Sequence, residues 1–511
     1  MKLLMNIQEI SLWIKAAAPD GQLSADSRRV QRGDVFFAYA GAGGFIAAAI
    51  EQGAAAVVHD ASDAWNDAWN VPHLAVPELK RQAGPVAHAF YGMPDAAMFS
   101  AGVTGTNGKT SCALWLAQAL AHLGQVSSVI GTLGVGLCKP RSEIEFDVTG
   151  YTTPDAVLLA RKLDGMRVAG AQAVAIEVSS IGLDQERVAG MHFDVAMLTN
   201  LTRDHLDYHG TMAAYEAAKT RLFDWPGLKT AVINLDDAMG LRVVQHVLAK
   251  PAGQLAGAWP VIGYTLRDAA TQPDLPGVLM LRASQFRSRH AGTDFHLACA
   301  LGTAMVKTRL VGHFNISNAL AVLGALLAHG TPLRAALDAI ESLEPAPGRM
   351  QQLGGQEAPM VVIDYAHTPD ALEKTLSALR QVAQERHGQL WCVFGCGGDR
   401  DPGKRPQMGA IAQLADHVVV TSDNPRSEEP QAIIEQIMAG MRADGAQAQA
   451  IENRAAAILS AIKHAAKPDV ILLAGKGHEP YQEIKGKKLP FSDAEHAQLA
   501  LSARLTMMRT N

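Results

Sequence analysis

Short apolar runs recur along the middle of the chain, separated by polar turns and helix-patterned segments. They cover residues 98–103, 173–178, 195–198 and 231–234. A helical pattern over residues 112–123 follows the first run. Strands that alternate with helices are typical of a parallel sheet covered by helices. The pattern therefore predicts an α/β fold with a central parallel sheet.

The same pattern returns in the last third of the chain. Apolar runs cover residues 361–364, 390–394, 417–421 and 470–474, and polar residues follow each run at once. In an open parallel sheet, ligands bind beyond the carboxyl ends of the strands. Four such ends predict a Rossmann-like domain with one shared site.

Two changes of pattern divide the chain into three predicted domains. The first block holds a Gly-rich turn at residues 41–44, a helical pattern over 45–52 and a short strand at 55–59. A Pro/Gly-rich stretch at residues 344–348 has the character of a linker. We expect a smaller α/β N-terminal domain, a central parallel-sheet domain and a Rossmann-like C-terminal domain, at residues 1–97, 98–346 and 347–511.

Composition excludes several classes of protein. The 511 residues carry a formal net charge of −5 without a long basic run, which argues against nucleic-acid binding. The richest apolar stretch, residues 319–328, is too short to span a bilayer and predicts a buried helix. The start of the chain lacks the pattern of a signal peptide. We therefore expect a cytoplasmic protein with no membrane insertion.

The cysteines are odd in number and scattered, which suits a reducing compartment. Cys392 and Cys396 could form a metal-ligand pair, but no second pair accompanies them. We therefore interpret the cysteines as buried structural thiols. The five positions are Cys112, Cys138, Cys299, Cys392 and Cys396.

A Gly-rich loop, TGTNGKT at residues 104–110, lies between a predicted strand and a predicted helix. Glycines let backbone N–H groups approach phosphate oxygens, and the start of a helix favours anions. Lys109, taken as a surface cation of the loop, can reach the β- and γ-phosphates. The generic pattern wants a glycine five residues before Gly108, where this chain has Val103. The loop is thus a shorter variant, and it predicts a P-loop ATPase domain in the centre of the chain.

This loop and six further motifs, in the same order, resemble the Mur ligase family, which also includes folylpolyglutamate synthase. The resemblance covers nearly the whole chain and is strongest to members that add 2,6-diaminopimelate. The further motifs are EVSS at residues 177–180, DHLDYH at 204–209, Asn315 with Asn318, GRM at 348–350, DYAH at 364–367 and GKGHE at 475–479.

The resemblance implies a route through an acyl phosphate. ATP phosphorylates the γ-carboxylate of the D-glutamyl residue in UDP-N-acetylmuramoyl-L-alanyl-D-glutamate, and the amine of meso-diaminopimelate then displaces phosphate. The implied partners are these three substrates with Mg²⁺, and a monomer is expected. Such an enzyme has to hold three anions together and neutralise the transferred phosphoryl group.

The resemblance also assigns residues to roles. It implies that catalysis uses Lys109, Glu177, His205 and Lys219. Metal binding is implied for Thr110, Glu177, His205 and Lys219, the last as an N6-carboxylysine formed with CO₂. ATP binding is implied for Gly105, Thr106, Asn107, Gly108, Lys109, Thr110, Ser111, Asn315 and Arg349.

Two further sets complete the implied site. The UDP-linked substrate is expected at Ser27, Thr152, Thr153, Ser179, Gln185 and Arg187, although the turn after Gly41 is shorter than in the family. Diaminopimelate is expected at Arg400, Asp423, Asn424, Pro425, Arg426, Gly475 and Glu479. A bidentate guanidinium at Arg426 would bind the distal carboxylate, and Glu479 would accept from the distal ammonium.

Each of these residues also has a purely structural interpretation. Glu177 could simply end a strand, His205 could lie on a surface loop, and Lys219 could be solvated. Asn315 could cap the helix that follows it. Arg426 could form an exposed ion pair with Glu428 or Glu429.

Two other functions remain open from the sequence. Folylpolyglutamate synthase shares the loop and the acyl-phosphate route, but the first domain with Asp26-Ser27-Arg28 and the run at residues 423–426 argue against it. A regulatory nucleotide-binding switch would leave the charged strand ends of the third domain unexplained.

Overall fold

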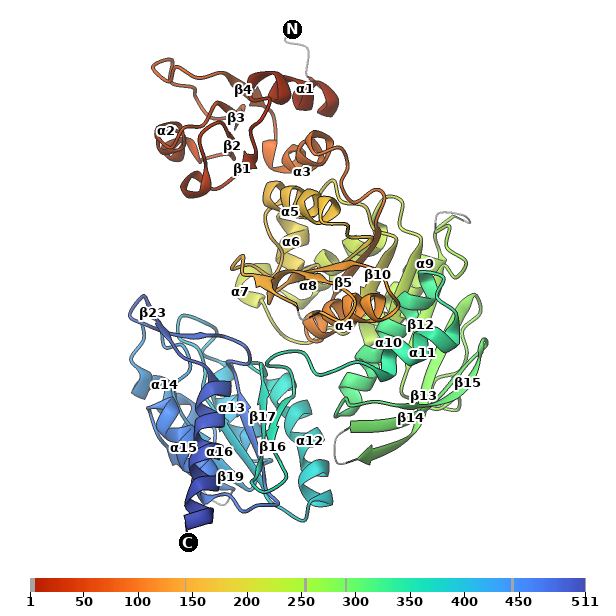
Figure 1. The fold of residues 1–511 in the computed structure, drawn as a ribbon, viewed down its shortest axis with the longest axis vertical. Helices are drawn as coiled ribbons and strands as arrows, with labels where there is room; N and C mark the ends of the chain where they lie inside the picture. Colours follow the sequence, from red (N-terminus) through yellow and green to blue (C-terminus); the bar gives the residue numbers. More distant parts are fainter. Residues whose placement is uncertain (1–4, 143, 252–254, 290–291, 443–444, 511) are drawn as a thin grey trace.

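The computed structural model arranges the chain around three main sheets, which follow one another along the long axis of the molecule (Figure 1). The N-terminal sheet lies at one end, the largest sheet in the middle and the C-terminal sheet at the other end. The structure describes residues 5–142, 144–251, 255–289, 292–442 and 445–510.

The N-terminal sheet is fully parallel. The first helix begins at a capping box, in which Asn6 Oδ1 accepts from the Glu9 amide and the Glu9 carboxylate accepts from the Asn6 amide. The predicted helix at residues 45–52 and strand at 55–59 are confirmed as α2 and β3. The elements are α1 (Ile7–Ala17), β1 (Leu23–Ser24), β2 (Val35–Ala38), α2 (Ile46–Glu51), β3 (Ala56–Asp60), β4 (His73–Val76) and α3 (Leu79–Phe90).

The central sheet has eleven strands in the order β15-β14-β13-β12-β11-β10-β5-β9-β6-β7-β8. From β13 to β6 all neighbours are parallel, and antiparallel strands extend both ends. All four strands predicted for this region are confirmed. The bounds are β5 Phe99–Thr104, β6 Ser127–Gly131, β7 Gly134–Cys138, β8 Phe146–Asp147, β9 Ala173–Glu177, β10 Val195–Leu198, β11 Thr230–Asn234, β12 Val261–Thr265, β13 Val278–Arg289, β14 Gly292–Cys299 and β15 Gly302–Lys307.

Two of the helices that cover this sheet, α4 and α10, are apolar on nearly every side and share one hydrophobic core. A helix that is apolar all round is expected in a core, and the predicted buried helix at 319–328 is confirmed. The helices are α4 (Lys109–His122), α5 (Ala156–Val168), α6 (Ser180–Asp184), α7 (Leu206–His209), α8 (Met212–Thr220), α9 (Ala238–Leu248), α10 (His313–Ala328) and α11 (Leu333–Glu341).

The C-terminal sheet has the order β16-β17-β21-β18-β19-β20, parallel except for β16. Asp364, Phe394 and Ala474 end neighbouring strands in register, so the polar loops after them emerge at one edge. The bounds are β16 Gln351–Gly354, β17 Met360–Asp364, β18 Leu390–Phe394, β19 His417–Val420, β20 Gln447–Ala450, β21 Val470–Ala474, α12 Pro369–Glu385, α13 Lys404–Ala412, α14 Pro430–Met438, α15 Arg454–His464, α16 Asp493–Thr510 and the hairpin β22 (Tyr481–Ile484) with β23 (Lys487–Pro490).

These sheets confirm the predicted α/β class, while the predicted domain limits stay predictions. Cys392 and Cys396 are buried, and burial raises the pKa of the Cys396 thiol to about 12. Cys112 and Cys138 are buried as well, whereas Cys299 is partly exposed. Within the described residues, every helix is too short or too polar to cross a membrane.

Candidate active site

The nucleotide loop connects β5 to α4 and depends on two glycines with positive φ. At Gly105, φ is 146° and a Cβ would lie 1.9 Å from the Thr199 hydroxyl oxygen. At Gly108, φ is 89° and a Cβ would lie 2.5 Å from the side-chain oxygen of Asn318. A side chain at either position would clash, so both turns of the loop require glycine, and the amides of Thr106 and Asn107 donate to Asn200.

Lys109 folds back onto its own loop. Its ammonium donates to the carbonyls of Gly105 (2.9 Å) and Thr106 (2.8 Å). Burial lowers the pKa of Lys109, and the charges of Glu177 and Asp204 oppose that shift. The expectation of a surface cation was therefore wrong: the ammonium of Lys109 is bound by two carbonyls of its own loop.

A cavity of about 600 Å³ opens between the central and C-terminal domains, next to this loop. Its volume lies in the range of small-ligand and cofactor sites. The lining residues come from the loop, from the start of α10 and from the strand ends of the third domain, and include Asn107, Thr110, His313, Asn315, Arg349 and Tyr365.

Contacts across this cavity link the two domains. Arg349 donates from Nη2 to the Thr110 hydroxyl at 3.2 Å, and its guanidinium lies 4.5 Å from the ring centre of Tyr365. Asn107 donates from Nδ2 to Asp370 Oδ2 at 3.1 Å. A cation of the third domain is thus held beside the phosphate loop of the second.

Asn315 lies inside α10 and not at its cap. Gly312 is the N-cap residue, while Asn315 donates from Nδ2 to the Val311 carbonyl at 2.9 Å. The capping interpretation of Asn315 is therefore wrong. Both Asn315 and Asn318 are buried, and Asn318 packs against Gly108.

Glu177 ends β9 with a buried carboxylate. Its Oε1 accepts from the Thr132 amide at 2.7 Å, and its Oε2 accepts from the Thr132 hydroxyl at 3.3 Å. A Cβ at Gly131 would lie 2.1 Å from Glu177 Oε1, so only glycine fits at this position, the last of β6. The same hydroxyl lies 3.1 Å from that of Thr152. The chain therefore fixes the orientation of this carboxylate at a strand end.

The residues expected to bind the muramoyl dipeptide form one network. The Thr153 hydroxyl donates to the Glu177 carbonyl at 2.8 Å and lies 3.1 Å from the Ser179 hydroxyl. Arg187 donates from Nη1 to the Thr153 carbonyl at 2.9 Å, and from Nη2 to Gln185 Oε1 at 2.7 Å. The sequence motifs that carry these residues therefore meet around the end of β9.

Lys219 lies in α8 with a side chain that is 1% exposed. Its ammonium donates to the Gly105 carbonyl at 2.8 Å and lies 4.3 Å from the ring centre of Tyr215. Burial lowers the pKa of Lys219 well below its ordinary value, and the charge of Lys109 lowers it further. The interpretation of Lys219 as a solvated lysine is therefore wrong.

His205 precedes α7 in the left-handed backbone region, with a φ of 52°. Its Nε2 lies 3.6 Å from Asp204 Oδ2, and its side chain is 42% exposed. Burial lowers the pKa of His205, and Asp204 opposes the shift. In the described part of the chain, no three His, Cys, Asp or Glu side chains cluster closely enough to hold a metal ion on their own.

The predicted uridine residues lie in the first domain. Ser27 is buried in a short 3₁₀ helix (Ser27–Arg29), which Asp26 caps by accepting from the Arg28 amide. Burial raises the pKa of Asp155, and the charge of Asp26 adds to that shift. Asp155 is the N-cap residue of α5, where its carboxylate accepts from the amides of Val157 and Leu158.

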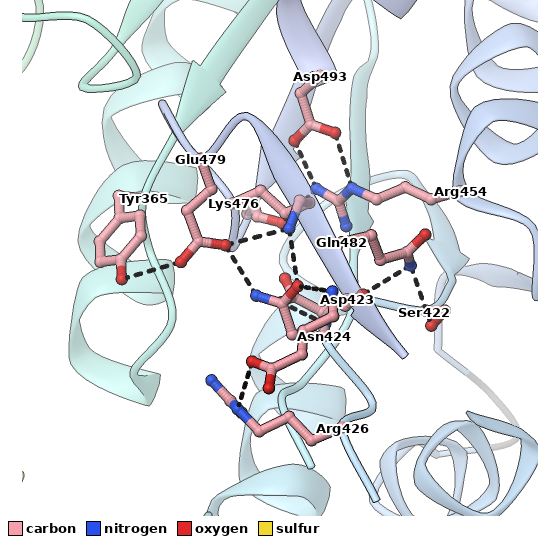
Figure 2. Close-up of polar contacts among 12 residues, drawn as sticks. Tyr365, Ser422, Asp423, Asn424, Arg426, Arg454, Lys476, Glu479, Gln482 and Asp493 are labelled. Atoms are coloured by element: carbon pink, nitrogen blue, oxygen red, sulfur yellow. Dashed lines mark hydrogen bonds and ion pairs between the residues drawn. The ribbon is translucent and has the colours of Figure 1, made fainter. Parts of the chain in front are cut away.

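Four of the residues expected to bind the amino acid lie together at the edge of the third sheet, namely Asp423, Asn424, Arg426 and Glu479 (Figure 2). Asn424 donates from Nδ2 to Glu479 Oε2 at 2.8 Å, and Arg426 donates from Nη1 to the Gly398 carbonyl at 2.6 Å. Asp423 and Pro425 belong to the same loop, and Gly475 follows β21 with a φ of 110°. Arg400 is exposed on the loop after β18.

Arg426 does not form the exposed ion pair that was the alternative. Its Nε lies 3.5 Å from Glu483 Oε2. Glu428 pairs with the buried Arg405 at 2.7 Å, and Glu429 pairs with Lys485 at 3.2 Å. The structure thus assigns both candidate partners of Arg426 to other cations.

Two residues of this site were missed. Thr132, which orients Glu177, stands in no recognisable motif. Lys476 lies inside the GKGHE motif, but its position gives no hint of its contacts. It is fully buried and donates to Asn424 Oδ1 and to Glu479 Oε2, both at 3.1 Å.

Known proteins with similar sequences indicate the family of this chain. A model of the Mur ligase middle domain matches residues 103–326, and a model described as Mur ligase, glutamate ligase domain matches residues 348–477. The UDP-N-acetylmuramoyl-L-alanyl-D-glutamate–2,6-diaminopimelate ligase of Janthinobacterium sp. (strain Marseille) is 59% identical over 498 residues, 96% of each chain. The chain belongs to the Mur ligase family.

Further relatives agree with this assignment to the Mur ligases. The protein of the same name from Ralstonia nicotianae (strain ATCC BAA-1114 / GMI1000) is 51% identical over 509 residues, 96% of this chain and 95% of the relative. A solved structure of a UDP-N-acetylmuramoyl-L-alanyl-D-glutamate–2,6-diaminopimelate ligase is 36% identical, with a TM-score of 0.65 over 94% of this chain and 95% of that one. The family resemblance that the motifs carried is confirmed over nearly the full length.

Proposed function

We propose that this Mur ligase joins meso-2,6-diaminopimelate to the D-glutamyl γ-carboxylate of UDP-N-acetylmuramoyl-L-alanyl-D-glutamate, with conversion of ATP to ADP and phosphate. The proposal rests on one observation, which is that the candidate nucleotide site and the candidate amino-acid site lie next to each other. The phosphate loop and the Arg426–Glu479 loops lie on either side of Arg349 and Tyr365. A phosphorylated carboxylate and an incoming amine can therefore be brought together in one place.

ATP occupies the cavity between the second and third domains. The loop from Gly105 to Ser111 holds the phosphates with backbone N–H groups, Lys109 and the Thr110 hydroxyl, and the start of α4 favours their charge. Asn315 faces the nucleoside from α10. Arg349 neutralises charge on the transferred phosphoryl group, a contribution typical of a preorganised cation.

Mg²⁺ fits oxygen donors at and near this cavity, of which the Thr110 hydroxyl lines the cavity itself. Mg²⁺ prefers six oxygen ligands and commonly keeps waters and substrate phosphates, so few protein ligands suffice. Thr110 and Glu177 provide a hydroxyl and a carboxylate beside the phosphate loop, and His205 lies near the same charges. When bound, the ion supplies charge neutralisation for the phosphates. The chain itself orients Glu177 through Thr132.

Lys219 carries a carbamate in the working enzyme. CO₂ reacts with a neutral amine, and burial favours the neutral form by lowering the pKa of Lys219. Carbamylation would turn a buried cation beside Lys109 into an anion, which removes the repulsion between the two side chains. The resulting carboxylate is a suitable oxygen ligand for a second Mg²⁺.

The UDP-linked dipeptide lies between the first and second domains. Ser27 contacts the uridine, and Thr152, Thr153, Ser179, Gln185 and Arg187 contact the muramoyl dipeptide. The network around the end of β9 supports this assignment, because a guanidinium and several hydroxyls meet there, and such groups can bind a carboxylate.

The amino-acid pocket discriminates through Arg426 and Glu479. Meso-diaminopimelate has a distal carboxylate and a distal ammonium, and L-lysine lacks the carboxylate. With L-lysine bound, the half-buried Arg426 would keep only its contacts with Glu483 and the Gly398 carbonyl. Loss of a hydrogen bond to a charged group costs about 1.5–3 kcal/mol. Arg400, Asp423, Asn424, Pro425 and Gly475 complete the pocket in this proposal.

Product formation tests the proposal against its alternatives. ADP and phosphate release should require both the UDP-dipeptide and diaminopimelate, and mass spectrometry should detect the UDP-tripeptide. Activity with a folate and glutamate would instead identify a folylpolyglutamate synthase. An ATP hydrolysis rate that does not depend on the UDP-dipeptide or on diaminopimelate would identify a nucleotide-dependent switch.

A further inference from the structure

Lys476 is a buried cation in the loop after β21. It stands between two glycines of positive φ, Gly475 (110°) and Gly477 (53°), and its side chain is 0% exposed. Removing an ammonium from water is costly unless close partners compensate its charge. The chain therefore keeps a charge here at some energetic cost, and its partners indicate why.

Those partners belong to the amino-acid pocket (Figure 2). The ammonium donates to Asn424 Oδ1 and to Glu479 Oε2, each at 3.1 Å. It also lies 5.7 Å from the ring centre of Tyr481. A single cation thus reaches both loops from which the pocket is built.

The two oxygens of the Glu479 carboxylate have different surroundings. Its Oε2 accepts from Lys476 and from Asn424 Nδ2, whereas its Oε1 has the Tyr365 hydroxyl at 3.5 Å, the outer limit of a hydrogen bond. The fixed oxygen sets the plane of the carboxylate. The other oxygen is left to accept from a substrate ammonium.

Arg426 is positioned by different contacts. Its Nη1 donates to the Gly398 carbonyl at 2.6 Å, and its backbone exchanges hydrogen bonds with the β22 hairpin through Glu483 and Lys485. Asn424 joins the two parts, because its Oδ1 also accepts from the Glu483 amide at 2.9 Å. Replacing Lys476 should therefore disturb Glu479 while the main supports of Arg426 remain.

We propose that Lys476 is a positioning residue that orients Glu479 for the distal ammonium of the amino-acid substrate. This role rests on the proposed function of the pocket. It predicts that Lys476 controls discrimination at the ammonium and leaves discrimination at the distal carboxylate, which Arg426 provides, nearly unchanged.

Two substrate analogues separate these effects. L-Lysine has a distal ammonium but no distal carboxylate, and 2-aminopimelate has the carboxylate but no distal ammonium. The ratios of kcat/KM for meso-diaminopimelate against each analogue are measured with the full-length enzyme, ATP and the UDP-dipeptide. The variants are Lys476→Met, which keeps length but removes the charge, and Lys476→Arg, which restores a cation.

In Lys476→Met, the preference over 2-aminopimelate should fall by about ten-fold or more, mainly through KM for diaminopimelate. The preference over lysine should stay within about two- to three-fold of the wild type, since Arg426 is held by Gly398, Glu483 and Lys485, whereas Lys476 donates to Asn424 and Glu479. Lys476→Arg should recover part of the lost preference. A merely structural lysine would lower both ratios together or neither.

Arg386→Met is the matched control for loss of a structural cation in the same domain. Arg386 donates to the carbonyls of Gly355 and Pro468, before β17 and β21 and so at the opposite edge of the sheet. The Arg386→Met variant should have a lower melting temperature, and both kcat/KM ratios should be unchanged. Unchanged ratios in Lys476→Met, or equal falls in both, would overturn the positioning role alone. A wild-type enzyme that ligates no diaminopimelate would overturn the proposed function as well.

Discussion

The Nη2 atom of Arg349 lies 3.2 Å from the hydroxyl oxygen of Thr110. A guanidinium of the third domain therefore donates to the first turn of α4, in the second domain. The same guanidinium covers the Tyr365 ring, which in turn faces Glu479. Arg349 thus contacts the nucleotide loop directly and lies against Tyr365, which contacts a residue of the proposed amino-acid site.

Arg349→Met should lower kcat/KM for ATP by about 10²-fold or more, as expected when a preorganised donor to a phosphoryl group is lost. Steady-state ligation at varied ATP measures this effect. Arg334→Met, on the surface of α11 with the side chain 85% exposed, is the control and should behave as the wild type. An unchanged kcat/KM for ATP would show that Arg349 only joins the domains.

Lys109→Met should abolish ligation, and it should also destabilise the loop. Its ammonium donates to two carbonyls of the loop, so a loss on the order of 1–3 kcal/mol in the free energy of unfolding is expected. Ligation assays and denaturant melts measure the two effects separately. Ligation at the wild-type rate with saturating ATP would contradict the assigned role.

Lys219→Ala should be inactive, and formate or acetate should restore part of the activity by replacing the carbamate anion. In the wild type, activity should decline in CO₂-free buffer. A ¹³C NMR carbamate signal from ¹³CO₂ should appear in the wild type and be absent in Lys219→Ala. Lys229→Ala, a lysine that is 55% exposed, is the control and should keep both signal and activity. Full activity without CO₂ would refute the carbamate.

His367 should make the fold sensitive to acid. Burial, with a smaller contribution from Lys404, lowers the pKa of His367 to about 4 from 6.5. Between these values the unfolded chain binds more protons than the folded one, so stability is fully present above pH 6.5 and is lost as the pH falls toward 4. At ~1.4 kcal/mol per pKa unit the loss is at most about 3.5 kcal/mol, and less where solvent reaches the ring.

Denaturant melts between pH 7 and pH 4 measure this loss. His367→Gln should flatten the pH dependence, while substitution of the exposed His122 should leave it as in the wild type. Equal slopes in the wild type and in His367→Gln would show that other groups carry the acid sensitivity.

Many of the strands could be predicted from the sequence, because parallel strands are buried on both faces of the sheet. Runs such as residues 195–198 and 470–474 are continuously apolar, and the structure buries every residue of β10 and β21. The strand β15 was missed, since most of its residues are exposed, and β14 was missed as well, since polar residues such as Thr293, Asp294 and His296 interrupt its apolar pattern. The start of α4 was also placed three residues too late, because Lys109, Thr110 and Ser111 look like loop residues in the sequence.

The candidate site was predictable where one short motif carries the chemistry. The phosphate loop and the GKGHE motif are each a single unbroken run of residues. Their residue types alone therefore suggest a function. The orientation of Glu177 by Thr132 was not predictable, because the two residues are 45 positions apart and meet only when β6 and β9 pair. The burial of Lys219 likewise follows from packing against the nucleotide loop and not from its own helix.

The choice of amino acid tests the account most directly. The kcat/KM values of the wild-type enzyme for meso-diaminopimelate and for L-lysine are compared with ATP and the UDP-dipeptide saturating. A pocket built around Arg426 should prefer diaminopimelate by about 10⁴-fold, and Arg426→Ala should reduce that preference mainly by weakening the use of diaminopimelate. Similar values for the two amino acids in the wild type would contradict the account of this pocket.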